Sequence, residues 1–131
     1  MEVNRVSLGK DRLVYVILQD KKIQYAEGRS RVVYIGTTRN GAARIATSAA
    51  HHAQDILAGR GVQGLEVRVI TCQPRRHVRT WTKLERALLL CFRELYGEPP
   101  LRNVQGKGIR EMDEFDYFSR ARLNRILEDL A

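Results

Sequence analysis

The sequence has little of the material from which disulfide frameworks, zinc sites or membrane spans are built. Its 131 residues include only two cysteines, Cys72 and Cys91, and their spacing matches no metal-ligand motif. We expect two reduced, buried thiols, the usual state of free cysteine. The longest apolar run, near residues 87–92, is well short of the roughly 18 residues of a membrane span. The first residues lack the apolar stretch of a signal peptide, so we expect a cytoplasmic protein with no membrane contact.

The sequence also lacks internal repeats, low-complexity tracts and a linker that would divide it. A chain of 131 residues can bury a core without disulfides. We therefore predict one domain over residues 1–131, with its core at about 12–110 and a C-terminal helix at about 113–130.

Positive charge is in excess: 23 lysines and arginines stand against 15 acidic residues, giving a net charge of +8 and an isoelectric point near 10.0. An excess of this size favours a polyanionic partner, most simply nucleic acid. The arginines are spread along the chain, so a basic protein without such a partner remains the alternative.

Three segments have the pattern of β-strands. Residues 13–18 are apolar and rich in β-branched side chains, which predicts a strand buried on both faces. Residues 31–36 predict a second strand, paired antiparallel with the first through a long polar connection at 19–31. Residues 65–70 alternate between apolar and charged types, which is typical of a half-buried edge strand. Residues 1–11 are polar and are expected to be a loosely held lead-in.

Three further segments have the pattern of helices, at about 41–57, 78–96 and 113–130, the last with Asp113 as its cap. On the first, Arg44, Ser48 and His51 share a face away from its apolar stripe. The elements together predict an α+β fold of the α/β sandwich kind. It has a small three-stranded, mainly antiparallel sheet flanked by helices, with an added C-terminal helix.

Residues 31–44 join a strand to a helix through a tight polar turn. Tyr34 lies where the strand ends, Gly36 stops the strand, and Arg44 falls in the first turns of the helix. This arrangement can hold a phenol and a guanidinium over one anionic group.

Five residues then follow a recognisable order. They are Tyr15 in Leu-Val-Tyr, Tyr34 in Tyr-Ile-Gly, Arg44 ten positions later (44 − 34 = 10), Glu85 in Lys-Leu-Glu-Arg, and Asn103 in Leu-Arg-Asn-Val. This pattern, over about residues 13–104, resembles the GIY-YIG nuclease family. The first motif lacks the family's glycine, and Ser48 stands where many members have a histidine or tyrosine.

The resemblance implies a metal-dependent DNA endonuclease that hydrolyses phosphodiester bonds. Glu85 would bind one Mg²⁺ or Mn²⁺, and Arg44 would hold the non-bridging phosphate oxygens. Tyr34, or else Tyr15, would be the general base, and its pKa would have to fall far from the free value of about 10. Asn103 would fix Glu85 or the phosphate backbone.

Other basic side chains are weaker candidates for DNA contacts, each about as consistent with an ordinary surface role: Arg39, His51, His52, Arg75, Arg76, Lys83 and Lys107. Trp81 is expected to pack in the core rather than stack on a base. The chain has no separate DNA-recognition domain, so specificity would come from its own surface, a homodimer or a partner protein. An inactive nucleic-acid-binding module is the alternative function, and a protein-interaction domain with incidental charge is a third.

Overall fold

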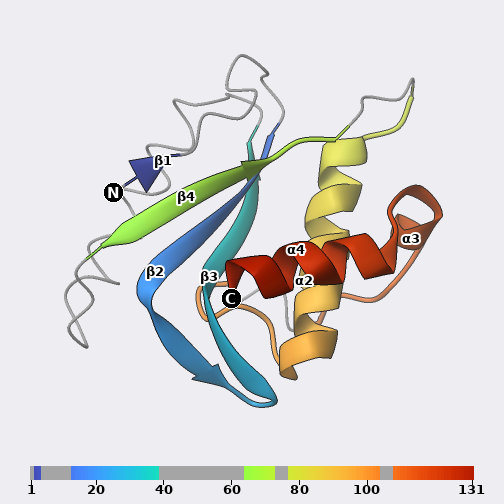
Figure 1. The fold of residues 1–131 in the computed structure, drawn as a ribbon. Helices are drawn as coiled ribbons and strands as arrows, with labels where there is room; N and C mark the ends of the chain where they lie inside the picture. Colours follow the sequence, from blue (N-terminus) through green and yellow to red (C-terminus); the bar gives the residue numbers. More distant parts are fainter. Residues whose placement is uncertain (1, 4–12, 39–63, 73–76, 104–107) are drawn as a thin grey trace.

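The computed structural model describes residues 2–3, 13–38, 64–72, 77–103 and 108–131. These form a four-stranded sheet in the order β1-β4-β2-β3 (Figure 1). The strands are β1 (Glu2–Val3), β2 (Leu13–Tyr25), β3 (Gly28–Thr38) and β4 (Leu65–Ile70). Strand β2 is antiparallel to both β3 and β4, which confirms the predicted three-stranded antiparallel sheet. The expected lead-in contributes the short β1, which pairs parallel with β4.

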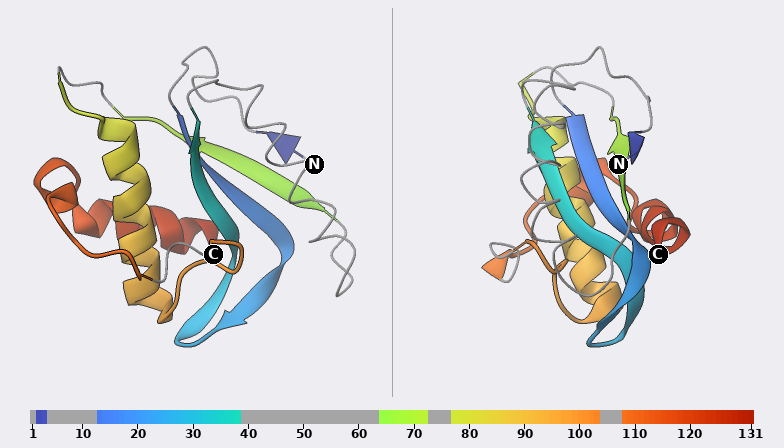
Figure 2. Two further views of the ribbon diagram at one scale, coloured as in Figure 1. Left: turned by 180° about the vertical axis from the view of Figure 1, so that it is seen from behind. Right: turned by 90° about the vertical axis from the view of Figure 1, so that its left-hand side faces the viewer.

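The β2–β3 hairpin is longer than its sequence predicts. Paired strands run to Tyr25 and restart at Gly28, so only Ala26 and Glu27 form the turn, and the predicted loop over residues 19–31 is wrong. Polar residues such as Lys21 and Lys22 look like a loop because this half of the hairpin exposes its side chains to solvent. The hairpin extends beyond the part of β2 that pairs with β4, and it bends there (Figure 2).

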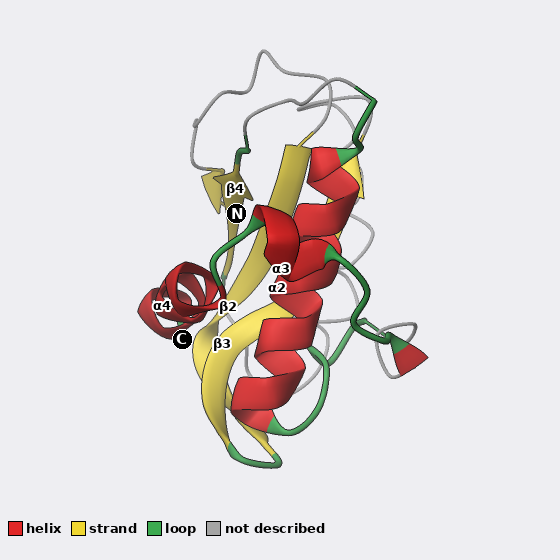
Figure 3. Cartoon of the chain, turned by 90° about the vertical axis from the view of Figure 1, so that its right-hand side faces the viewer, coloured by secondary structure: helices red, strands yellow, loops and turns green. Residues whose placement is uncertain are grey.

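The described helices are α2 (Thr80–Tyr96), α3 (Glu114–Tyr117) and α4 (Arg120–Leu130). Helix α2 packs against β3 and β2, and α4 crosses α2 on the same face of the sheet (Figures 1 and 3). Gly97 ends α2 in the left-handed conformation, at a φ of 79°, and its N–H donates to the Arg93 carbonyl over 2.8 Å. None of the described helices is long and apolar enough to cross a membrane.

The C-terminal segment forms two helices, not the single predicted one. Phe118 is extended between them, and Ser119 begins α4 by accepting a hydrogen bond from the Arg122 N–H over 3.3 Å. Asp113 precedes α3 but makes no side-chain capping bond, because its carboxylate pairs with Lys83. Asp113 therefore occupies the predicted N-cap position, but of the short α3 and without a side-chain bond, and Ser119 makes that bond at α4.

A buried ion pair ties the segment after α2 back onto that helix. The Glu114 carboxylate is almost fully buried, and it accepts hydrogen bonds from Arg86 Nε and the Met112 N–H, both at 2.7 Å. Burial alone would raise the pKa of Glu114, but these two bonds outweigh it and leave the pKa below its usual value. Arg86 also donates to the Arg110 carbonyl. The chain between α2 and α3 is thereby anchored at one guanidinium.

The sheet has apolar side chains on both faces. Val14, Val16 and Leu18 pack with α2 and α4, whereas Leu13, Tyr15 and Ile17 join a second cluster with residues of β3 and β4. The prediction that residues 13–18 are buried on both faces is confirmed. The predicted helix at 41–57 lies outside the described residues.

Candidate active site

Two tyrosine rings lie over Gly36, two residues before the end of β3. Tyr15 of β2 is the register partner of Gly36, and its ring centroid is 5.9 Å from that of Tyr34. A Cβ on Gly36 would be 2.6 Å from Tyr34 Cε1 and 2.9 Å from both Cζ and the hydroxyl oxygen of Tyr15. No side chain fits in that space, so the glycine is what lets both phenols lie close against the strand.

An irregularity in the β2–β3 pairing precedes this pair. Ile17 faces Tyr34, but the next pair is Leu18 with Val32, so the register skips Val33. Such β-bulges redirect side chains and are frequent next to active sites. Val33 and Tyr34, although consecutive, both pack with the cluster that contains Tyr15. Tyr15 is buried there at 2% exposure, and Tyr34 is only partly buried.

Asn103 holds the segment between these aromatic positions. The Ile35 N–H donates to Asn103 Oδ1, and Asn103 Nδ2 donates to the Ile35 carbonyl, both over 2.8 Å. The Arg102 N–H donates to the Val33 carbonyl over 2.9 Å. Residues 102–103 are thus bonded to the outer edge of β3, Arg102 through its backbone and Asn103 through its side chain. Asn103 was expected to fix Glu85 or a phosphate, but these bonds give it the task of positioning Tyr34-Ile35-Gly36.

Tyr25 supports the same edge and was missed in the sequence, where it falls in the expected loop. Its hydroxyl donates to the Val32 carbonyl over 2.6 Å and accepts from the Leu101 N–H over 3.0 Å. Burial raises the pKa of Tyr25 to about 12. A tyrosine that immediately precedes a two-residue hairpin turn carries no sequence signal that would identify this role.

Glu85 approaches β3 from α2 and meets the residue after Gly36. Its half-buried carboxylate is hydrogen-bonded by the hydroxyl and the backbone of Thr37. Burial raises the pKa of Glu85, while the Thr37 bonds and the Arg86 charge oppose the change. Gly36 pairs with Tyr15 and Thr37 with Val14, whose side chains lie on opposite faces of the sheet. The tyrosine pair and the carboxylate therefore converge on one strand end from its two faces.

A metal at this position would rest on one protein carboxylate. In the described part of the chain, no three histidine, cysteine, aspartate or glutamate side chains gather closely enough to hold an ion. Mg²⁺ is commonly bound through one or two carboxylates while it keeps several waters, so Glu85 alone fits that ion. A bound cation would also favour the charged form that burial disfavours.

The remaining predicted residues are placed as follows. Lys83 Nζ lies 2.6 Å from Asp113 Oδ1 and 5.1 Å from the centre of the Tyr117 ring, so its charge is paired within the protein rather than held for DNA. Trp81 packs against the core, as predicted. Cys91 is fully buried, but Cys72 is only partly so. The other predicted residues lie outside the described ones: Arg39, Arg44, Ser48, His51, His52, Arg75, Arg76 and Lys107.

Comparison with models of known protein families, with characterised proteins and with solved structures gave no significant match. The candidate site is therefore defined by its own geometry. It consists of two tilted phenols over a glycine, the partly buried Glu85 carboxylate bonded to the residue after that glycine, and an amide that fixes the backbone of Ile35.

Proposed function

We propose that this protein is a metal-dependent DNA endonuclease that hydrolyses phosphodiester bonds with a Tyr/Arg/Glu site. One observation carries the proposal: Gly36 lies under the rings of Tyr15 and Tyr34, and the adjacent Thr37 is hydrogen-bonded to Glu85. Burial disfavours the charged form of Glu85, and a bound cation would offset that penalty. The net charge of +8 supports a polyanionic substrate.

Each residue has a distinct task in this proposal. Glu85 holds one Mg²⁺ or Mn²⁺, which when bound supplies charge to the phosphate and the leaving oxygen. Tyr34, the more exposed phenol, accepts the proton of the attacking water, and the buried Tyr15 orients Tyr34 or the phosphate. Arg44 binds the non-bridging oxygens. Asn103 acts indirectly, because it sets the backbone from which Tyr34 projects.

A plasmid-nicking assay tests the proposal. Purified protein is incubated with supercoiled DNA in Mg²⁺, in Mn²⁺ and in chelator, and wild type is compared with Glu85→Gln and Tyr34→Phe. We expect metal-dependent nicking by wild type and a loss of about 10²-fold or more in each variant, the size typical of removing a group that acts in the transition state.

Two matched controls use the same chemical changes elsewhere. Glu128→Gln alters an exposed carboxylate on α4, and Tyr117→Phe alters a phenol beside Lys83. Both should cleave as wild type does. Nicking in chelator, or full activity of Glu85→Gln, contradicts the proposed mechanism. Salt-sensitive DNA binding without cleavage by wild type would instead indicate an inactive nucleic-acid-binding module.

A further inference from the structure

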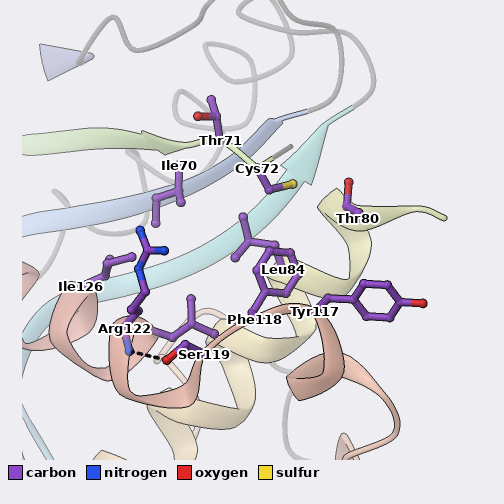
Figure 4. A pocket seen from close by; sticks show the side chains of 11 residues that line it. Ile70, Thr71, Cys72, Thr80, Leu84, Tyr117, Phe118, Ser119, Arg122 and Ile126 are labelled. Carbon is purple, nitrogen blue, oxygen red and sulfur yellow. Dashed lines mark hydrogen bonds between the residues drawn. The ribbon is translucent and has the colours of Figure 1, made fainter. Parts of the chain in front are cut away.

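A second concave site lies apart from the tyrosine pair. A pocket of about 320 Å³, here named the β4–α4 pocket, opens between the end of β4, the start of α2 and the α3–α4 junction. Ile70, Leu84, Phe118 and Ile126 form apolar walls (Figure 4). Ligand sites usually combine such walls with a few polar groups, at volumes of about 300–1,000 Å³. The lining residues that the structure describes do not include Tyr15, Tyr34, Glu85 or Asn103.

Arg122 is the one charged side chain among these lining residues. Figure 4 shows its guanidinium extending from α4 toward Ile70 at the end of β4. Four cations of the described chain have acidic partners: Arg68 pairs with Glu66, Lys83 with Asp113, Arg86 with Glu114, and Arg120 with Glu94 and Glu111. Within the same part of the chain, the Arg122 guanidinium has no acidic partner.

We propose that the β4–α4 pocket binds a small amphipathic carboxylate. Its ring-sized or branched apolar group packs on Leu84, Phe118 and Ile126, and its carboxylate meets Arg122. A planar guanidinium beside apolar walls suits this class, because it bonds a carboxylate through two parallel N–H groups and is weakly hydrated. Thr71, Thr80 and Ser119 are the small polar residues among the pocket's lining. The site is independent of the proposed nuclease activity.

Charge selectivity follows from the lining. The Tyr117 hydroxyl does not offer the ligand a second polar partner, since the Tyr117 ring points away from the other lining side chains in Figure 4. An uncharged ligand of the same shape keeps the apolar contacts but loses the charge-assisted hydrogen bonds. A cationic one is repelled. The pocket should therefore rank phenylacetate above phenylacetamide, and phenylacetamide above phenethylamine.

Cys72 provides a reporter inside the pocket. Its thiol is partly buried and lines the cavity, whereas Cys91 is fully buried and burial raises the pKa of its thiol to about 11. Since the thiolate is the reactive form, iodoacetamide should alkylate Cys72 and spare Cys91. A ligand in the pocket then slows the reaction at Cys72, which peptide mass spectrometry follows.

The experiment measures alkylation of Cys72 in the full chain against increasing phenylacetate, phenylacetamide and phenethylamine. We expect phenylacetate to protect in a saturable way, and its dissociation constant to rise about tenfold or more in Arg122→Gln, which removes the paired charge-assisted hydrogen bonds. Arg125→Gln is the matched control, because this exposed arginine lies on the same helix outside the pocket. It should leave protection unchanged.

Methyl chemical shifts of Leu84 and Ile126 give a second measurement that does not depend on thiol reactivity. They should move with phenylacetate, and those of Leu13 on the far face of the sheet should not. Absence of protection and of shifts overturns the proposal. So does equal protection by phenylacetamide, or an equal loss in Arg122→Gln and Arg125→Gln.

Discussion

Both ends of the Asn103 carboxamide are hydrogen-bonded to a single residue, Ile35. The oxygen takes the Ile35 N–H and the nitrogen donates to the Ile35 carbonyl, so one side chain completes the ladder on the outer edge of β3. An exposed strand edge is otherwise a template for pairing with another chain. Ile35 lies between Tyr34 and Gly36, so the same bonds fix the backbone that carries the tyrosine pair.

Asn103→Asp should destabilise the protein in a pH-dependent way. At neutral pH one carboxylate oxygen still accepts the Ile35 N–H, but the other faces the Ile35 carbonyl, at a cost of about 1–3 kcal/mol. The protonated carboxyl can donate to that carbonyl, so folding raises its pKa. The variant therefore matches wild type most closely below the unfolded pKa and loses stability as pH rises through the folded one.

Urea unfolding of both proteins at acid and at neutral pH measures this effect as a difference in free energy of unfolding. Groups common to both proteins cancel in the difference. An equal loss at the two pH values would show that Asn103 does not pair with both backbone groups of Ile35.

Gly36→Ala tests the contact under the phenols. The added methyl would be 2.6 Å from Tyr34 Cε1 and 2.9 Å from Tyr15 Cζ, so at least one ring must move. Overpacking of this kind costs about 1–3 kcal/mol, and the displaced phenols should also abolish nicking. Gly64→Ala is the control, since no described atom lies within 4 Å of its Cβ position. Urea unfolding should show a loss at position 36 alone; equal losses at the two positions would refute the steric argument.

The sequence was sufficient to predict the pairing that brings Tyr15 close to Tyr34. Residues 13–18 and 31–36 have the β-branched composition that favours strands, and both lie in strands that pair antiparallel, although β2 and β3 extend beyond the predicted bounds. The prediction that Gly36 stops the second of these strands is wrong, because β3 continues through Thr37 to Thr38, which pairs with Leu13. The positions of strands depend on local composition and on side-chain alternation, which a sequence displays directly.

The partners of polar groups were less predictable. Asn103 was predicted to contact Glu85 or DNA. It instead bonds the backbone of Ile35, which lies 68 residues earlier in the chain, and no sequence pattern indicates that pairing. The skipped Val33 has no sequence signal, because valine suits either register. The break at Ser119 was concealed by apolar residues whose helical spacing continues through it. Long-range geometry decides each of these features.

Tyr25→Phe should lower the free energy of unfolding by weakening the attachment of residue 101 to β3. It removes the hydroxyl that joins the Val32 carbonyl to the Leu101 N–H, and leaving the buried Val32 carbonyl without this bond costs about 1–3 kcal/mol. Folding raises the pKa of Tyr25 to about 12. The phenol's contribution is therefore full below the unfolded value of about 10 and is lost as pH rises toward the folded one.

Chemical unfolding from neutral to alkaline pH checks both parts of this prediction. The difference in free energy of unfolding between wild type and Tyr25→Phe should shrink as the phenol ionises. Tyr117→Phe should show no comparable effect. If the difference in free energy of unfolding stays constant to the highest pH measured, the Tyr25 hydroxyl does not make these two hydrogen bonds.

Glu85→Gln should make the protein more stable at neutral pH. Burial raises the pKa of Glu85, so the folded protein holds this proton to higher pH than the unfolded chain does. The carboxyl's stabilising contribution is then present below the unfolded pKa and is lost as pH rises through the folded pKa. Glutamine keeps an oxygen for the Thr37 hydrogen bonds without a charge to desolvate. Its melting temperature should exceed that of wild type by a few degrees at neutral pH and match it in acid.

Adding Mg²⁺ separates a metal ligand from a merely buried carboxylate. An ion that binds only the folded protein raises its melting temperature by mass action, so Mg²⁺ should stabilise wild type and leave Glu85→Gln unchanged. Glu128→Gln should respond to Mg²⁺ as wild type does. If Glu85→Gln is less stable than wild type at neutral pH in chelator, the carboxylate contributes to folding, and its burial gives no support to a catalytic role. If Glu85→Gln is more stable and insensitive to Mg²⁺, the Glu85 carboxylate destabilises the metal-free fold and is needed for Mg²⁺ binding, as the proposed role requires.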